Sequence, residues 1–168
     1  MARKLPVGPS ADPYIFGLFS NFLLLVSSVY AGIADRALEL GVAAAHRRQS
    51  LKSGTSYAQD PDIRYQLATA AITLDSLGPQ IETLAADVDG LVNHGGDWFR
   101  YLVGTKTRVV DAAREIVEIA LRVSGGQGYA ADAELTRLYR DALAGLFQPS
   151  DPESAHSTIA NNLLGYPN

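Results

Sequence analysis

The sequence contains no cysteine among its 168 residues. This absence excludes disulfide scaffolds, thiolate zinc sites, iron–sulfur clusters and cysteine nucleophiles. Basic residues are also scarce, since 14 Lys and Arg stand against 18 Asp and Glu and the formal net charge is −4. Phosphate neutralisation supplies most of a protein's affinity for nucleic acid, so a mildly acidic chain without a basic stripe is not expected to bind it.

Motifs for common catalytic and metal sites are missing as well. The sequence has no G-x-S-x-G, H-E-x-x-H, Walker A or EF-hand pattern. His46, His94 and His156 are far apart, and none has a second ligand at helical spacing. Glu115 and Glu118 lack the histidine that a di-iron bundle needs. We therefore expect no metal site.

Charge is absent from one long stretch, Ile15 to Ala34, which is long enough to be a transmembrane candidate. However, Tyr14, Asn21, Ser28 and Asp35 recur every seven positions and share one helix face. No cluster of Lys or Arg flanks the stretch to set an orientation. We interpret it as the most buried helix of a cytoplasmic protein, without a membrane span.

The rest of the chain predicts an all-α protein, because no window shows sustained β alternation. Three prolines and one glycine predict that residues 1–13 form an extended lead-in. A helical domain follows over residues 14–168. The apolar spacing predicts an antiparallel, up-down four-helix bundle with a short extra C-terminal helix. The expected helices cover residues 12–48, 60–91 with a kink or break at Gly78–Pro79, 97–124, 132–147 and 150–164.

Two groups of basic residues are expected to face solvent. Arg47 and Arg48 are interpreted as a solvated helix end, where cations complement the helix dipole, and an anion site is the alternative. Lys106 and Arg108 are placed on the solvated side of the third helix, opposite an apolar stripe that includes Val109.

The segment that carries chemistry is the turn Gly125-Gly126-Gln127-Gly128-Tyr129 between two helices. Its three glycines permit positive φ angles and expose backbone amides, and such a turn can receive a phosphate. The alternative is a tight turn that serves close helix packing. No strand precedes the turn, so a Rossmann site is excluded.

This GG-x-GY turn, followed by a short spacer, an R-L-Y-R-D-A helix and a final short helix, resembles the C-terminal domain of the acyl-CoA dehydrogenase family. The run Gly32 to Glu39 looks like that domain's first helix, and Lys106 to Arg122 looks like the helix before its glycine turn. The resemblance covers Tyr14 to Leu164.

The resemblance implies a flavoprotein whose FAD lies between a middle β-domain and this bundle, and whose bundles build a dimer or tetramer. The glycine turn of a neighbouring subunit would approach the FAD diphosphate. By carry-over, Arg122, Gly125, Gly126 and Gln127 would face the cofactor, Arg122 standing where relatives often have glutamine. Such chains are much longer, so this one looks like a detached C-terminal domain of an oxidoreductase with an acyl-CoA-type substrate, and we expect no catalysis by this domain alone.

One departure from the family leaves the reaction open. Many acyl-CoA dehydrogenases place a glutamate base nine residues after the arginine of R-D-A, and here that position is Pro149, preceded by Gln148. Neither side chain accepts a proton at neutral pH, so we name no catalytic residue. The hypotheses are a dehydrogenase-like domain, the equivalent domain of a two-component flavin-dependent monooxygenase, and a purely structural helical interaction module.

Overall fold

A computed structural model describes residues 12–167, and over that range the chain is helical with no strand. The all-α prediction is confirmed. Most of the predicted lead-in lies outside the described residues, so that prediction stays untested. The helices are α1 (Pro13–Arg47), α2 (Pro61–Asp75), α3 (Leu77–Asp89), α4 (Trp98–Ser124), α5 (Glu134–Leu143) and α6 (Pro152–Leu164).

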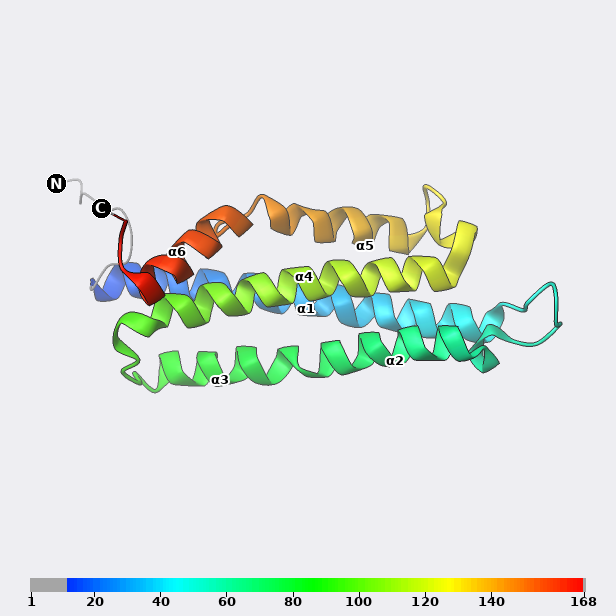
Figure 1. The fold of residues 1–168 in the computed structure, drawn as a ribbon, viewed down its shortest axis with the longest axis horizontal. Helices are drawn as coiled ribbons and strands as arrows, with labels where there is room; N and C mark the ends of the chain where they lie inside the picture. Colours follow the sequence, from blue (N-terminus) through cyan, green and yellow to red (C-terminus); the bar gives the residue numbers. More distant parts are fainter. Residues whose placement is uncertain (1–11, 168) are drawn as a thin grey trace.

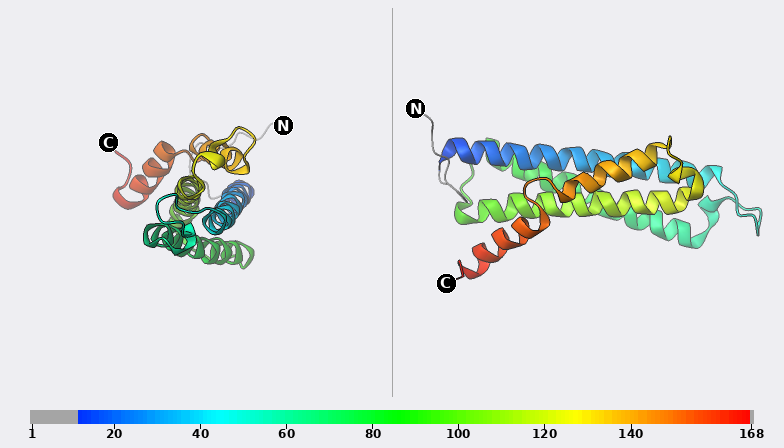
Figure 2. Two further views of the ribbon diagram at one scale, coloured as in Figure 1. Left: turned by 90° about the vertical axis from the view of Figure 1, so that its right-hand side faces the viewer. Right: turned by 90° about the horizontal axis from the view of Figure 1, so that it is seen from above.

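The predicted bundle is confirmed as well. Figure 1 shows four antiparallel arms: α1, then α2 and α3 end to end, then α4, then α5. α6 follows α5 but leaves the bundle axis, as Figure 2 shows from above. The expected break in the second arm occurs at Ser76, so that Pro79 falls in the first turn of α3, where its missing N–H removes no helical bond.

Helix starts follow the predicted capping residues in most cases. The carboxylates of Asp12, Asp60 and Asp151 accept hydrogen bonds from the backbone of the turns they begin, and each is followed by a proline. Asp97 precedes α4 as expected, but its side chain makes no capping bond and instead pairs with Arg100 at 3.3 Å.

The expectation that the first helix is the most buried is wrong. In α4, 15 of 27 residues are buried, against 11 of 35 in α1. α4 packs against α1, α2, α3, α5 and α6, and its apolar stripe lies at the centre of the core. α1 contacts α2, α3, α4 and α5, yet it leaves large apolar side chains such as Leu25 and Val29 exposed.

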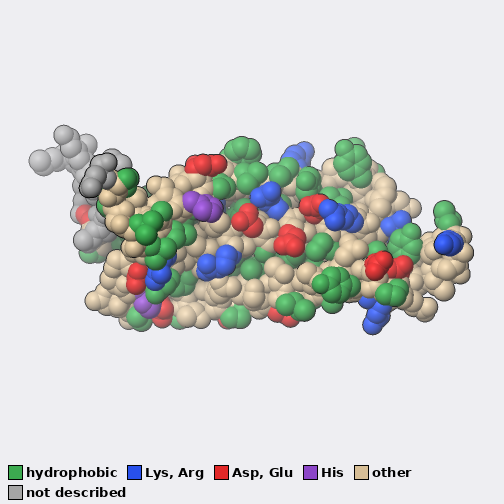
Figure 3. Space-filling model, in the orientation of Figure 1, with side chains coloured by type: hydrophobic (Ala, Val, Ile, Leu, Met, Phe, Trp, Pro, Cys, Tyr) green, Lys and Arg blue, Asp and Glu red, His purple; other side chains and the backbone are tan. Residues whose placement is uncertain are grey.

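The outer side of α1 carries a row of exposed apolar residues at spacings of four, three and four: Leu18, Phe22, Leu25 and Val29. By length and composition α1 could cross a membrane, since an 18-residue window has a mean hydropathy of 1.7 and one third of it is buried. Elsewhere, on the face drawn in Figure 3, charges of both signs alternate with apolar side chains and no basic stripe forms.

The assignment of Lys106 to solvent is also wrong. Its side chain is 1 % exposed, and Nζ donates to the carbonyl oxygens of Gly145, Gln148 and Ser150 at 3.0, 3.2 and 2.7 Å. Lys106 lies three positions after Val103 and three before Val109, which puts it on the buried stripe. Helical spacing here outweighs the usual preference of lysine for water.

Candidate functional site

The glycine turn lies at the surface, at the end of the bundle where α4 stops and α5 begins (Figure 1). Gly126 and Gln127 are exposed, Gly125 is half-buried and Gly128 is buried. The turn is therefore not enclosed by the core of its own chain, and its backbone is within reach of another molecule.

Two of the three glycines are required by the chain itself. Gly125 has φ of 62°, and a Cβ there would lie 2.7 Å from Nη2 of Arg48. A Cβ on Gly128 would lie 2.7 Å from Cβ of Ser124. Gly126 differs, because a Cβ on it would meet nothing within 4 Å and its φ is not positive. The conformation and packing of this chain thus explain why glycine is needed at positions 125 and 128, but they do not explain the glycine at position 126.

Arg48 brings a positive charge to the turn. Its guanidinium donates to the carbonyl oxygen of Val123, close to the C-terminal end of α4, and lies 4.5 Å from the centre of the Tyr57 ring. Arg48 is half-buried, so the interpretation of this residue as a solvated helix end is wrong. Its contact joins residues 75 positions apart, a relation that no local pattern reveals.

Thr136 on α5 fixes the other end of the turn. Its hydroxyl donates to the carbonyl oxygens of Gly128 and Ala130 at 3.0 and 2.9 Å. Arg48 is bound to Val123 at the end of α4, and Thr136 in the first turn of α5 is bound to Gly128 and Ala130, so the backbone of the turn is held from both sides. The turn is a pre-formed surface feature of the bundle.

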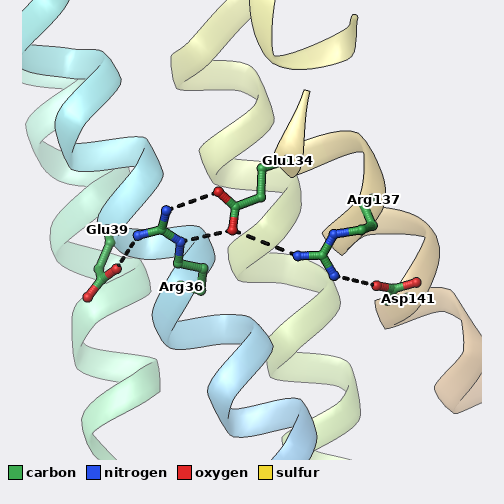
Figure 4. A network of polar contacts seen from close by, with 5 residues as sticks. All are labelled: Arg36, Glu39, Glu134, Arg137 and Asp141. Carbon is green, nitrogen blue, oxygen red and sulfur yellow. Dashed lines mark hydrogen bonds and ion pairs between the residues drawn. The ribbon is translucent and has the colours of Figure 1, made fainter. Parts of the chain in front are cut away.

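A network of ion pairs ties this end of α5 to α1 (Figure 4). Nε and Nη2 of Arg36 each lie 3.0 Å from an oxygen of Glu134, and Arg137 connects Glu134 to Asp141. The hydrogen bonds from Arg36 lower the pKa of Glu134, and those to Glu134 and Glu39 raise the pKa of Arg36. This network orients the helix that leaves the turn.

Arg122, the cation assigned to the site by resemblance, points elsewhere. It is exposed and pairs with Glu118 one turn earlier in α4. Both side chains line a shallow groove against α2, together with Tyr65 and Thr69. The structure thus brings Arg48, rather than Arg122, against the turn glycines.

No group of three potential metal ligands is found in residues 12–167.

A cavity of about 390 Å³ lies between the start of α1, the start of α4 and the segment that leads into α6. Its lining is mainly apolar, and Phe147 at its edge is 83 % exposed. The lining residues are Phe19, Leu23, Phe99, Val103, Phe147, Pro149, Ser150, Asp151, Ser154 and Thr158. Asp151 is the carboxylate in this set, and its hydrogen bonds from Ser154 lower its pKa, so it is a poor proton acceptor.

Comparison with known proteins gives relatives of more than one activity. L-evernosamine nitrososynthase of Micromonospora sp. is 27 % identical over 98 % of this chain and 39 % of its own length. Acryloyl-CoA reductase (NADH) of Anaerotignum propionicum is 30 % identical over 66 % of this chain and 27 % of its own length. Among solved structures, XiaF from Streptomyces sp. in complex with FADH2 matches 89 % of this chain and 39 % of its own, with a TM-score of 0.77 and 17 % identity.

The chain spans less than half the length of these relatives. The family described as "Acyl-CoA dehydrogenase, C-terminal domain" matches residues 24–147. This range contains α1 from Leu24 onward, α2 to α5 and the whole glycine turn. The chain belongs to the C-terminal domain family of the acyl-CoA dehydrogenase-like flavoproteins.

Proposed function

We propose that this chain is the C-terminal domain of a larger FAD-dependent oxidoreductase, in which it contacts the cofactor of a neighbouring subunit and builds the subunit interface. The observation that carries the proposal is the exposed glycine turn with a cation against it. Membership of the family supports it, and so does a fold shared with a protein that binds FADH2.

The residues at the turn fit a diphosphate. Gly126 leaves open space that its own chain does not use, and Arg48 has guanidinium N–H groups beyond the one bound to Val123. We assign diphosphate binding to Gly125, Gly126, Gln127 and Arg48, and Arg122 would join them only by leaving its ion pair with Glu118. When bound, FAD supplies the acceptor and donor of electrons. The turn residues hold and orient its diphosphate and take no part in proton transfer.

The apolar part of the substrate fits the cavity beside α6. The cavity combines aromatic walls with a few polar groups at its edge, an arrangement typical of small-molecule sites. Along α4, Val103 in the cavity and Ser124 at the turn are 21 residues apart, about 32 Å at 1.5 Å per residue. This separation between cavity and turn supports a cofactor shared between subunits.

The exposed row on α1 supports assembly into a dimer or tetramer. Leu18, Leu25 and Val29 are each more than half exposed, more apolar surface than an isolated bundle keeps in water. We assign this row to contacts with a second copy or with the middle domain, in a cytoplasmic protein without a membrane span.

A flavin-dependent monooxygenase is the second candidate, and one observation favours it. Pro149 and Gln148 occupy the place where a dehydrogenase of this family would need a base, and the nearby Asp151 is engaged as the cap of α6. A reaction of reduced flavin with oxygen does not require that base to remove an α-proton. The nitrososynthase relative, which matches 98 % of this chain, supports the same candidate.

The two candidates give different results with the complete flavoprotein. A dehydrogenase is expected to lose its oxidised flavin absorbance when acyl-CoA thioesters are added without oxygen. A monooxygenase is expected to keep that absorbance and to need both a flavin reductase and oxygen for turnover.

Both candidates require that this domain contacts FAD and builds the subunit interface. Deletion of residues 12–167 from the complete protein tests that role. The expected result is loss of bound FAD and dissociation of the oligomer. Retention of FAD and of the native oligomer would contradict the proposed function and leave a structural module.

A further inference from the structure

Lys106 is a buried cation whose hydrogen bonds all reach one short segment. An ammonium group has three donors, and here three carbonyl oxygens face it, those of Gly145, Gln148 and Ser150. Because each N–H finds an acceptor, the cation is tolerated at 1 % exposure. Burial lowers the pKa of Lys106, and the carboxylates of Asp151 and Asp111 oppose that shift.

The segment it holds, residues 145–151, has few regular bonds of its own. It lies between the short helical turn Ala144–Leu146 and the start of α6. Within it, Oε1 of Gln148 is buried without a hydrogen-bond partner in the described part of the chain. A buried unpaired acceptor is costly, so this conformation needs an external restraint. The three bonds from Lys106 supply it.

The same segment forms one wall of the cavity. Phe147, Pro149, Ser150 and Asp151 line it, opposite Phe19 on α1 and Phe99 on α4. Lys106 does not line the cavity itself, so it acts on the wall from behind. Val103, one turn earlier in α4, does line it. α4 therefore contributes both Val103 to the lining of the cavity and the cation that holds its opposite wall.

We propose that Lys106 is a positioning residue for substrate binding: by gathering the carbonyls of Gly145, Gln148 and Ser150, it fixes the wall that shapes the cavity. The inference rests on the proposed function in one respect, that the apolar part of the substrate lies in this cavity. It adds to that function a residue that touches neither substrate nor flavin and yet sets the affinity for substrate.

The test is Lys106→Met in the complete flavoprotein, with Lys52→Met as the matched control, since Lys52 is an exposed loop lysine. Hydrogen–deuterium exchange of peptides covering residues 145–151 is expected to accelerate about tenfold or more in Lys106→Met. The glycine turn, about 27 Å away along α4, is expected to exchange as before and FAD occupancy to stay unchanged. Unaltered exchange over residues 145–151 would overturn the inference.

Kinetics separate positioning from general destabilisation. With the substrate that the complete enzyme turns over, KM is expected to rise about tenfold while kcat per bound flavin changes little, and Lys106→Arg is expected to recover most of the loss. An equal fall in kcat with unchanged KM would overturn the positioning role. If deletion of residues 12–167 leaves FAD bound and the oligomer intact, the proposed function fails, whereas the exchange experiment still decides what Lys106 does.

A second pair of variants serves if Lys106→Met does not fold. A Cβ on Gly145 would lie 2.5 Å from Cγ1 of Val110, so Gly145→Ala pushes an acceptor of Lys106 away. The same acceleration of exchange and rise in KM are expected. Adding Val110→Ala removes the clashing methyl groups and is expected to reverse both effects; failure of the double variant to do so would contradict the inference.

Discussion

Arg36 on α1 and Glu134 in the first turn of α5 are joined by two parallel hydrogen bonds of 3.0 Å, although 98 positions separate them in the sequence. This pair fixes the helix that leaves the glycine turn against the longest helix of the bundle (Figure 4). This pair, Arg48 and Thr136 together hold the turn in place.

The Arg36–Glu134 pair predicts a stability that depends on pH. Because its folded-state pKa lies below the ordinary value of 4.5, Glu134 stabilises the fold above that pH and loses its effect as the pH falls through the lowered value. Glu134→Gln is therefore expected to lower the urea midpoint at pH 7 and to match the unaltered protein near the acid end. Glu115→Gln, an exposed carboxylate on α4, is the control. An equal deficit at both pH values would contradict the assignment.

Alanine substitutions at two glycines of the turn are expected to change the free energy of unfolding by different amounts. Gly128→Ala places a Cβ 2.7 Å from that of Ser124 and is expected to lower the free energy of unfolding by about 1–3 kcal/mol. Gly126→Ala meets nothing within 4 Å and is expected to change it by less than about 0.5 kcal/mol. Denaturation in urea measures both. Equal losses would show that Gly126 is also needed for packing.

Arg48 is predicted to serve both the turn and the cofactor. Arg48→Gln removes the charged hydrogen bond to Val123 and is expected to lower the free energy of unfolding by about 1–2 kcal/mol. In the complete flavoprotein it is expected to weaken FAD binding about tenfold, and to reduce the dependence of that binding on salt. The exposed neighbour Arg47 gives the control, Arg47→Gln. Similar FAD affinities for the two variants would contradict the role of Arg48.

The exposed row on α1 predicts where the oligomer forms. Leu25 and Val29 are 65 % and 62 % exposed, and Leu25→Glu with Val29→Glu is expected to dissociate the oligomer without loss of helicity. Ile72→Glu, at a similarly exposed position on α2, is the control. Sedimentation of the unaltered protein as a clean monomer at tens of micromolar would count against this interface.

Local patterns predicted most of the fold but not which faces are covered. Proline and aspartate at helix starts placed the boundaries of α1, α2 and α6 to within a few residues, because capping is a local interaction. α1 was mistaken for the most buried helix because apolar residues on all sides do not reveal whether its own chain or another molecule covers them.

The candidate site likewise contains some residues that the sequence predicts and others that it does not. The glycine turn is visible in the sequence, since glycine content alone signals an unusual backbone. Arg48 is not, because its partner Val123 is brought to it by the packing of two helices. Lys106 lies between these cases, because its helical position on the apolar stripe predicts burial whereas its residue type predicts exposure.

The dissociation constant of FAD for Gly126→Glu tests the central claim most directly. In the complete flavoprotein, the glutamate would place a negative charge and a side chain in the space assigned to the diphosphate, and we expect FAD affinity to fall about a hundredfold. Gly96→Glu is the matched control, because a Cβ on Gly96 also meets nothing within 4 Å and Gly96 lies at the other end of α4. Equal FAD affinity in the two variants would contradict the account.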